Sequence, residues 1–512
     1  MGNKIITFAA IYIGTYESSM KIFELSAQRK MRVIDSLRRR LPLGSDTFSK
    51  GYVASDRVEE LCEILKEYAK IMTGYRVDDY KAYAGPSLLN ATNRLFLQDQ
   101  IQRRTGLSVE FLTNSEHRFI SYKSVACTEQ FDLYTKDKTA VVDIGGGSLQ
   151  ITLFRDGKVI TTQHLVLGTL RLKEKLSAHG NSILHMRRQI AELTSKEMEL
   201  FHQMYLEDVQ MDSVILMGDY CSEIVKKIEK KHGDNAVPME KFFQYLNKLE
   251  NKSANQLSEE LDLANENDPL VIPALELIRN ITSELNPQIV WVPGVSISDG
   301  IAYDYVGKHK IFKIAHVFEE DIRSAAYSLA ERYHVNLSHT KMMVGITKEL
   351  FTATKKLHGL GSREELLLEV ASILHDCGRY VSFVNAAQCS YDIIMASEII
   401  GLSHKEREIV ANIVKYNVHQ LDSYKKLSDK LDEKSYICVA KLSAILRLSN
   451  ALDRSHKQKI KALKAVLKEK NLTITIETKG DILLEKTAVF FKADTFEQVF
   501  GVTPVLIEKR KY

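Results

Sequence analysis

The sequence predicts an α/β protein in two parts: an α/β front half, and a mostly α-helical back half that ends in a small strand-bearing tail. Three observations lead to this fold class. Strand and helix patterns alternate over about the first 305 residues, which is typical of layered α/β domains. Helical patterns then dominate as far as residue 470, and short β-type runs return between residues 471 and 512.

Each expected element of the front half follows from its residue pattern. Residues 4–13 form an apolar run typical of a strand. Residues 56–72 carry apolar side chains at steps of three and four, which predicts an amphipathic helix. Further strands are predicted at 80–85, 108–112, 139–146, 149–154, 213–218 and 288–294.

The back half is expected to be helical from residue 308, including the lysine-rich segment 457–470. In the tail, strands are expected at 471–478, 483–494 and 504–510. The lysines of segment 457–470 could attract a polyanion, although a solvated helix face is the simpler interpretation. No aromatic residues are interleaved with these lysines, so the sequence predicts no nucleic-acid binding.

The composition is that of a soluble globular protein, with 45% apolar and 27% charged residues among 512 and a net charge of +4. The six cysteines include no CxxC pair, which favours reduced thiols in a cytoplasmic protein over a disulfide framework or a zinc knuckle. The apolar N-terminal stretch is short and strand-like, so we expect neither a signal peptide nor a membrane span.

Two hairpins in the front half resemble each other. Residues 8–25 and 139–154 each read as a strand, an Ile-Gly turn, small polar residues and a second strand, and Tyr12 of the first matches Asp143 of the second. Such a repeat predicts two similar lobes with a ligand between them. A chance likeness of two apolar hairpins is the alternative.

The second hairpin turns through Gly145, Gly146 and Gly147. Glycine lacks a Cβ atom, so these residues can adopt positive φ and let a bulky anion approach the backbone N–H groups. Ser148 adds a hydroxyl donor, and Asp143 adds a carboxylate for a hard cation such as Mg²⁺. An ordinary hairpin turn is the alternative. Three glycines exceed what a two-residue turn needs, so we favour a phosphate loop.

The order of motifs along the chain resembles one family. The hairpins FAAIYIGTYESSMKIFEL and VVDIGGGSLQITLF are similar to the two phosphate loops of the exopolyphosphatase/guanosine pentaphosphate phosphatase (Ppx/GppA) family. The segments NSEHRF, HLVLGTLRL and VWVPGVSISDGIAYDY follow in the family's order. In the back half, LLLEVASILHDCGRY and KLSAILRLSNALDRSH resemble the HD-type helical domain of its longer members. The resemblance covers nearly the whole chain.

The resemblance implies a two-lobed actin/sugar-kinase-like (ribonuclease H-like) fold. Its parts would be lobe I at residues 1–128, lobe II at 129–307, an HD-like domain at 308–470 and an α+β tail at 471–512. Family members hydrolyse the terminal phosphoanhydride of inorganic polyphosphate or of guanosine pentaphosphate, using Mg²⁺. Long members commonly pair, so we expect a homodimer, and either phosphate compound as the partner.

The resemblance also assigns roles to residues of this chain. Glu116 would activate the attacking water, or His117 in a register shifted by one residue. Arg171 and Asp143 would contact phosphate and Mg²⁺, respectively. The phosphate ligands of the loop would be Gly145, Gly146, Gly147 and Ser148.

Several positions depart from the family pattern. Tyr12 and Gln150 stand where the family has metal-binding carboxylates, and Leu89 stands where the family has a phosphate-binding arginine. Asp219 lies in a later turn, where its charge would repel polyphosphate. We therefore expect an inefficient exopolyphosphatase-type hydrolase. The alternatives are a catalytically reduced paralogue that senses or scaffolds polyphosphate or guanosine tetra/pentaphosphate, and a structural partner without a ligand.

The HD-like segment offers His339, His375 and Asp376 as metal ligands. The distal aspartate of an HD site falls at Asn450, and Asn417 stands where a histidine is expected. The set is therefore incomplete, and we expect a structural role for His375 and Asp376.

Overall fold

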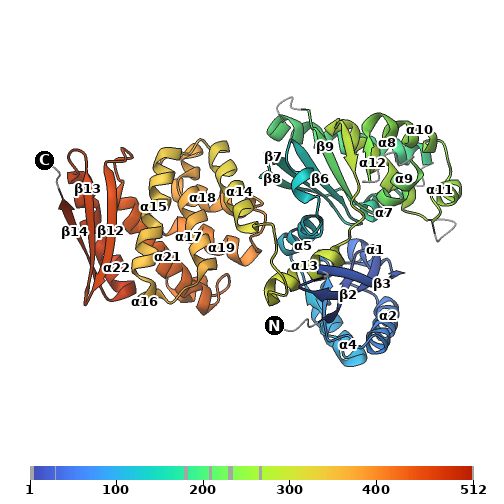
Figure 1. Cartoon of the computed structure of the whole chain (residues 1–512), viewed down its shortest axis with the longest axis horizontal. Helices are drawn as coiled ribbons and strands as arrows, with labels where there is room; N and C mark the ends of the chain where they lie inside the picture. Colours follow the sequence, from blue (N-terminus) through green and yellow to red (C-terminus); the bar gives the residue numbers. More distant parts are fainter. Residues whose placement is uncertain are drawn as a thin grey trace. The chain divides into compact units, whose positions relative to one another are not determined.

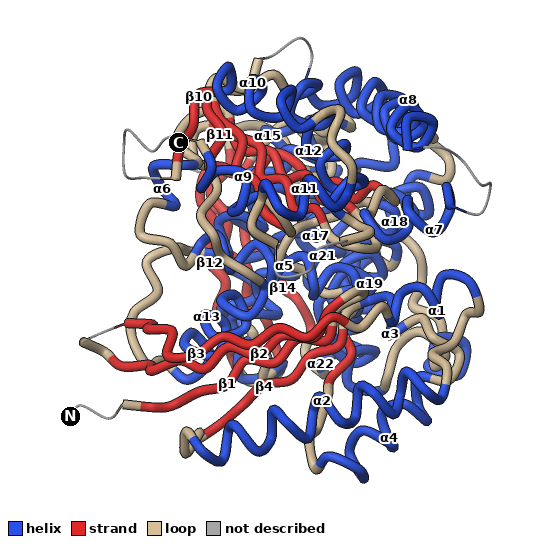
Figure 2. The backbone as a smooth tube through the Cα atoms, turned by 90° about the vertical axis from the view of Figure 1, so that its right-hand side faces the viewer, coloured by secondary structure: helices blue, strands red, loops and turns tan. Residues whose placement is uncertain are grey.

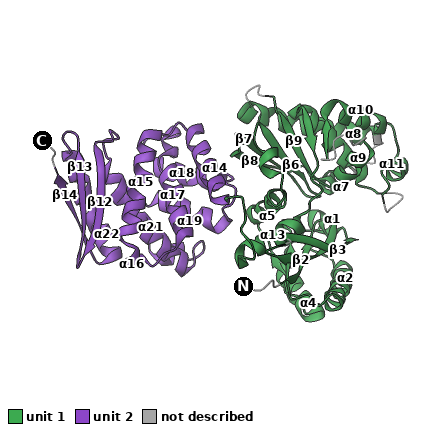
Figure 3. Ribbon diagram, viewed as in Figure 1, with its two compact units in different colours: residues 1–317 green, residues 318–512 purple. Residues whose placement is uncertain are grey.

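The computed structural model describes residues 5–28, 30–177, 183–206, 210–228, 235–263 and 268–509. The chain divides into two compact units, Met1–Val317 and Phe318–Tyr512, coloured green and purple in Figure 3. The first unit contains two β-sheets with surrounding helices, and the second contains helices and a three-stranded sheet (Figure 1). Within the described ranges, no helix is both long and apolar enough to cross a membrane.

Unit 1 contains the strands β1 (Ile6–Ile13), β2 (Glu17–Ser26), β3 (Lys30–Arg40), β4 (Asp79–Ala84), β5 (Glu110–Phe111), β6 (Thr139–Ile144), β7 (Leu149–Arg155), β8 (Lys158–Leu165), β9 (Ser213–Gly218), β10 (Ala236–Pro238) and β11 (Ile289–Trp291). One sheet has the order β3-β2-β1-β4-β5, and the other has the order β10-β11-β9-β6-β7-β8. In each, an antiparallel meander (β3-β2-β1 or β8-β7-β6) is extended by two parallel strands. The shared order confirms the two similar lobes expected from the hairpin repeat.

The helices of unit 1 are α1 (Leu43–Ser49), α2 (Ser55–Gly74), α3 (Pro86–Leu89), α4 (Arg94–Thr105), α5 (Asn114–Ala126), α6 (Phe131–Tyr134), α7 (Thr169–Ser177), α8 (Ile183–Phe201), α9 (Cys221–Lys227), α10 (Met239–Leu249), α11 (Ala254–Glu260), α12 (Val271–Leu285) and α13 (Ile297–His309), with a π-helix η1 (His202–Leu206) after α8. Helices cover both faces of the first sheet (Figure 2), because β1 is apolar on both. Ala9 and Ile11 belong to the core under α2 and α4, whereas Phe8 and Ala10 belong to the core under α13.

Helix α13 returns the chain to the first lobe. It packs against α5, β1 and β2, and a Cβ atom at Gly300 would lie 2.0 Å from the carbonyl oxygen of Ile120 on α5. Only glycine allows this close approach of the two helices. The expected boundary at residue 307 therefore falls inside α13, and the compact unit ends at Val317.

The register of the two hairpins places the matched residues alike. Tyr12 pairs with Ser19 across the first hairpin, and Asp143 pairs with Gln150 across the second. The backbone N–H of Gly14 donates to the carbonyl of Glu17 at 2.8 Å, and the N–H of Gly145 donates to that of Ser148 at 2.9 Å. The two turns therefore have the same length and the same closing hydrogen bond.

Unit 2 contains α14 (Phe318–Arg332), α15 (Leu337–Ala353), α16 (Lys355–His358), α17 (Ser362–Leu374), the 3₁₀ helix η2 (Cys377–Tyr380), α18 (Ala386–Ala396), α19 (His404–Lys415), α20 (Tyr424–Leu427), α21 (Glu433–Leu452) and α22 (Leu483–Phe500). Its sheet has the order β12-β13-β14, formed by Ile460–Lys468, Asn471–Thr478 and Thr503–Lys509.

Two predictions for the tail are wrong. The lysine-rich segment 457–470 contains strand β12 instead of a helix, because Leu463, Ala465 and Leu467 alternate with more exposed residues and the strand pairs with β13. Segment 483–494, expected as a strand, opens helix α22. The buried Val489 and Phe496 of α22 recur at helical spacing, and the helix packs against α21.

Candidate functional site

A cavity of about 290 Å³ lies in unit 1 where the two hairpin turns meet. Thr15 of the first turn lies beside the second, since a Cβ atom at Gly146 would be 3.4 Å from the Cβ of Thr15. The Thr15 and Ser87 hydroxyls are hydrogen-bonded at 3.1 Å. Both turns thus contribute polar groups to one cavity, as the repeat predicts.

The start of helix α7 holds the glycine loop in place. The N–H groups of Thr169 and Leu170 donate to the carbonyls of Gly145 and Gly146, at 3.1 and 2.9 Å. A Cβ atom at Gly168 would lie 2.3 Å from the carbonyl carbon of Gly147, so the HLVLGTLRL segment needs a glycine to pack on the loop. The carbonyls of the loop are therefore occupied by α7.

The N–H groups of the same loop remain available. Within the described part of the chain, those of Gly146, Gly147 and Ser148 donate to no acceptor, and all three residues line the cavity. Successive N–H groups of this kind form a concavity that binds anions. None of the three glycines adopts the positive φ that glycine allows. Their missing Cβ atoms instead make room for Thr15 and Phe48.

Arg171 adds a positive charge beside the loop. Its Nε donates to the Gly147 carbonyl at 2.9 Å, and its guanidinium lies 4.2 Å from the centroid of the Phe48 ring. Burial lowers the pKa of Arg171, and no carboxylate among the described residues pairs with it. An uncompensated cation next to free N–H groups attracts an anion, and a guanidinium suits the oxygens of a phosphate.

The carboxylate expected to hold Mg²⁺ is in the cavity. Asp143 accepts a short hydrogen bond from the Ser121 hydroxyl, and burial raises its pKa. Gln150 is buried, and its Nε2 donates to the Thr152 hydroxyl at 3.3 Å. Burial, followed by the charge of Asp143, raises the pKa of Tyr12 far above its ordinary value, so its phenol is neutral at pH 7.

Two further carboxylates line the cavity, Glu17 and Asp219. Arg38 lies between them, at 3.7 Å from Glu17 and 3.6 Å from Asp219. Asp219 was expected to repel polyphosphate, but Arg38 balances part of its charge. The hydrogen-bond partner of Asp143 is instead the neutral hydroxyl of Ser121. This donor set does not fit a Mg²⁺ ion held by the protein, so we derive no catalytic step through the metal.

Glu116 does not line the cavity. It occupies the third position of α5, where its Oε2 accepts hydrogen bonds from the N–H and hydroxyl of Thr113 at 2.9 and 2.7 Å in a capping box. The next residues, His117 and Arg118, do line the cavity. Burial lowers the pKa of His117 to about 4, and its ring centroid lies 5.5 Å from that of Tyr12.

Some cavity residues were not singled out from the sequence. Arg38 comes from strand β3 and Ser87 from the short helix α3. Thr15 had a usable signal, because the hairpin repeat aligns it with Gly146. Leu89, which stands where the family has an arginine, does not line the cavity.

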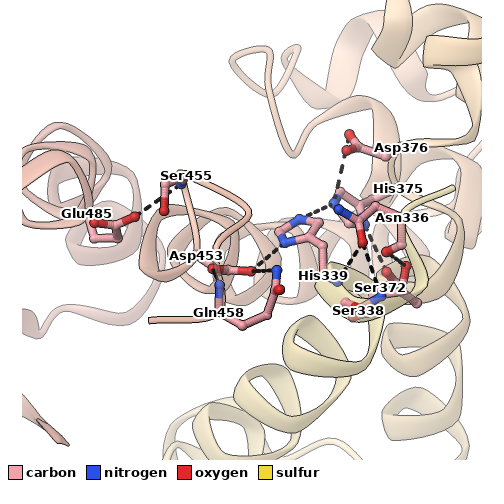
Figure 4. A network of polar contacts seen from close by, with 11 residues as sticks. Asn336, Ser338, His339, Ser372, His375, Asp376, Asp453, Ser455, Gln458 and Glu485 are labelled. Atoms are coloured by element: carbon pink, nitrogen blue, oxygen red, sulfur yellow. Dashed lines mark hydrogen bonds and ion pairs between the residues drawn. The ribbon is translucent and has the colours of Figure 1, made fainter. Parts of the chain in front are cut away.

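In unit 2, the structure brings His339, His375 and Asp376 together (Figure 4), with one ligand atom of each within 4.8 Å of the others. Asp453 follows the last residue of α21 and lies beyond Asn450, the position at which the HD pattern has an aspartate. Its Oδ2 lies 2.7 Å from Nδ1 of His339. The three clustered residues are those that the sequence predicts, and Asp453 is a hydrogen-bond partner of His339 that does not take the place of the missing ligands.

The duplicated strand order and the cavity between two matched turns define a two-lobed, actin/sugar-kinase-like protein. The family model of the Ppx/GppA phosphatases matches residues 22–309, and the model of their domain III matches residues 322–490. The chain belongs to the Ppx/GppA phosphatase family.

Solved structures of this family are similar in fold. An exopolyphosphatase from Cytophaga hutchinsonii is 14% identical over 60% of this chain and 100% of its own, with a TM-score of 0.51. An exopolyphosphatase-like protein is 18% identical over 60% of this chain and 99% of its own, also with a TM-score of 0.51. The Ppx/GppA family member of Aquifex aeolicus is 19% identical over 61% of this chain and 100% of its own, with a TM-score of 0.49.

Proposed function

We propose that unit 1 binds the terminal phosphates of inorganic polyphosphate or of guanosine pentaphosphate, and that it hydrolyses the terminal phosphoanhydride slowly. The observation that carries this proposal is the loop of Gly146, Gly147 and Ser148, which lines the cavity beside Arg171 and whose N–H groups donate to no acceptor in the described structure. Membership of the Ppx/GppA phosphatase family supports phosphoanhydride chemistry at this position.

The expected slowness follows from the charges of the cavity. Phosphoryl transfer needs groups that neutralise charge on the transferring phosphate, and a single such donor is worth about 3 kcal/mol of transition-state stabilisation. The loop and Arg171 supply donors. Tyr12 and Gln150 supply no negative charge where the family has metal-binding carboxylates, and Gln150 offers a hard cation only a neutral carbonyl oxygen.

Two residues compete for the role of general base. His117 lines the cavity, and at pH 7 its imidazole is in the neutral form that can accept a proton, although the burial that lowers its pKa to about 4 also makes it a weaker base. Glu116 would first have to leave its capping box with Thr113. The geometry favours His117, the alternative register of the sequence.

The experiment measures phosphate release from polyphosphate and from guanosine pentaphosphate in the presence of Mg²⁺. We expect slow release, abolished by His117→Gln and unchanged by Glu116→Gln, because glutamine preserves the capping box. Loss of release with Glu116→Gln alone would restore Glu116 as the base. Absence of both release and saturable binding would overturn the proposal.

A second function is favoured by the same cavity. Asp143 alone is a poor site for Mg²⁺, so the chain would bind the phosphate compound as a sensor or scaffold without hydrolysis. Saturable binding without phosphate release would identify this function.

Restoring the carboxylates separates the two functions further. We expect Tyr12→Asp combined with Gln150→Glu to raise Mg²⁺-dependent phosphate release about tenfold or more, because two charged ligands return to the cavity. Phosphate release is followed as a function of Mg²⁺ concentration, with Tyr12→Asn combined with Gln150→Asn as the uncharged control. An unchanged rate would show that the metal lies elsewhere.

A further inference from the structure

The three-stranded sheet of unit 2 has one covered edge and one open edge. Along the edge strand β12, helix α15 packs against the sheet, and Glu349 of α15 accepts a hydrogen bond from the N–H of Ala465 at 3.1 Å. At the other edge, β14 pairs with β13 on one side only. An uncovered edge strand presents backbone groups that can pair with another chain. Strand β14 is therefore the part of this sheet suited to pair with a further strand.

The pairing of β14 with β13 shows which backbone groups of β14 face outward. The N–H of Thr503 donates to the carbonyl of Lys470 at 2.9 Å, so the backbone groups of Thr503 face β13. Successive residues of a strand direct their N–H and C=O groups to opposite edges, so those of Leu506 face away from β13. Apart from the ladder with β13, no hydrogen bond within the described ranges involves the backbone of Leu506.

An exposed apolar face of α22 lies beside this edge. Lys486 of α22 lies 2.7 Å from Glu508 of β14, which places this face of the helix next to the strand. Leu483 and Phe490 lie three residues before and four residues after Lys486, so they share its helix face. Their side chains are 65% and 75% exposed. Apolar side chains gathered beside an open strand edge indicate an interaction surface.

We propose that β14 pairs antiparallel with β14 of a second copy of this chain, about a two-fold axis at Leu506, so that the two three-stranded sheets join into one. In this register, Leu506 exchanges two backbone hydrogen bonds with Leu506 of the second copy. Val505 and Ile507, which are exposed on the outer face of the sheet, lie opposite Ile507 and Val505 of the second copy. The family resemblance predicts a pair of chains without a surface, and the open edge assigns both a surface and a register.

A second copy fits this surface because the surface is complementary to itself. The two-fold axis brings α22 of both chains to the same side of the joined sheet, so that Leu483 and Phe490 of one chain approach those of the other. Leu484 and Phe491 of α22 are exposed as well. Burial of these four side chains in both chains, together with the strand pair, amounts to roughly the 1,000 Å² that a stable interface requires.

The test measures the mass of the full chain by light scattering after size-exclusion chromatography, over a range of concentrations. We expect the mass of two chains. Val505→Lys combined with Ile507→Lys should raise the dissociation constant of the pair about 10–100-fold, because lysines then face lysines across the axis. Val466→Lys is the matched control, since Val466 is aligned with Val505 on the same face of the sheet but lies on β12. A single-chain mass of the wild type at every concentration, or equal dissociation constants of these two variants, would overturn the proposal.

A second pair of variants tests the contact of the helices. Phe490→Ala should weaken the pairing about tenfold or more, because a buried aromatic side chain at the centre of an interface contributes strongly to binding. Phe383→Ala is the control, since Phe383 is equally exposed but lies in the segment before α18. If both alanine variants pair as tightly as the wild type, α22 is not part of the interface.

Cysteine cross-linking tests the register directly. Val505→Cys combined with Ile507→Cys would place thiols of the two copies opposite each other, at a Cα separation of about 4.5 Å that a disulfide can span. Mild oxidation should link two chains of this variant, whereas the wild type and Val466→Cys should remain unlinked. Cysteine changes the strand little, so this test stays decisive if a lysine variant fails to fold. A two-chain mass without cross-linking would show that the chains pair through another surface.

Discussion

At the scale of single residues, Arg171 shows how a side chain acquires its role from what surrounds it. An exposed arginine is usually a solvated charge, but Arg171 is stacked on Phe48 and anchored to Gly147. Its orientation is therefore set before a ligand arrives, which reduces the entropic cost of binding. The free N–H groups of the loop lie within the same cavity.

Arg171→Lys keeps the charge but loses the planar fork and the hydrogen bond to Gly147. We expect polyphosphate to bind about 10–100-fold more weakly, since hydrogen bonds to charged groups are worth about 1.5–3 kcal/mol. Calorimetric titration measures this change. Arg103→Lys, on the exposed surface of α4, is the control and should bind as wild type. Equal affinities of the two variants for polyphosphate would show that Arg171 does not bind it.

Glu17 makes the stability of unit 1 depend on pH. Burial, followed by the charge of Asp219, raises the pKa of Glu17 to about 7, although Arg38 and Arg40 oppose the shift and Asp268 adds to it. The folded chain then keeps a proton that the unfolded chain releases above its ordinary pKa of 4.5. The free energy of unfolding therefore falls as pH rises between about 4.5 and 7.

Glu17→Gln removes this proton-linked loss of stability. We expect the variant to be more stable than the wild type above pH 7, and the difference to shrink toward pH 4.5. Urea unfolding at several pH values measures both curves. A wild-type advantage that grows with pH would contradict the direction of the pKa shift.

At the scale of elements, the sequence predicted the apolar strands of unit 1, because apolar runs next to turn residues leave few other choices, but it did not predict β3, β8 or β10. The tail was predicted poorly for a physical reason. Strand β12 carries lysines at helix-like spacing, and its pairing with β13 decides its conformation. Helix α22 begins with apolar residues that suit a strand, and packing against α21 decides the outcome. The conformations of β12 and α22 therefore depend on contacts with distant segments, which a local sequence pattern does not contain.

The site was predicted unevenly for the same reason. The glycine loop and Arg171 carry local motifs and were identified. Arg38 is positioned by the pairing of β3 with β2, which no spacing reveals. The sequence did not decide between Glu116 and His117 as the residue in the cavity. The capping box of α5 holds Glu116 outside the cavity, and the next residue, His117, lines it.

The capping box of α5 leads to a prediction about stability. Glu116→Ala should lower the free energy of unfolding by about 0.5–2 kcal/mol, because the N–H of Thr113 loses its acceptor, whereas Glu116→Gln should change it by a few tenths. Chemical denaturation measures both. Glu63→Ala, an exposed helical glutamate paired with Lys66, is the control with an expected effect below about 1 kcal/mol. Equal losses in the alanine and glutamine variants would contradict the role of the cap.

At the scale of the whole molecule, the two lobes of unit 1 depend on each other for their stability. Unit 1 is a duplicated fold whose lobes are held together by charge as well as by packing. Arg40 at the end of β3 lies 2.5 Å from Asp268, which precedes α12 in the second lobe and is fully buried. The Tyr220 hydroxyl donates to the same carboxylate at 2.6 Å. A buried carboxylate held in this way depends on its cation.

Arg40→Gln should therefore destabilise unit 1 by up to about 3 kcal/mol, because Asp268 stays buried without its partner. The adjacent Arg39→Gln is a matched control: Arg39 pairs with Glu67 on the surface, where an ion pair contributes less than about 1 kcal/mol. Urea unfolding compares the two variants. Adding Asp268→Asn to Arg40→Gln should recover much of the loss, since the unpaired charge disappears. If the two single arginine variants are equally stable, the lobes are held by packing alone, and the Arg40 pair contributes no more than a surface contact.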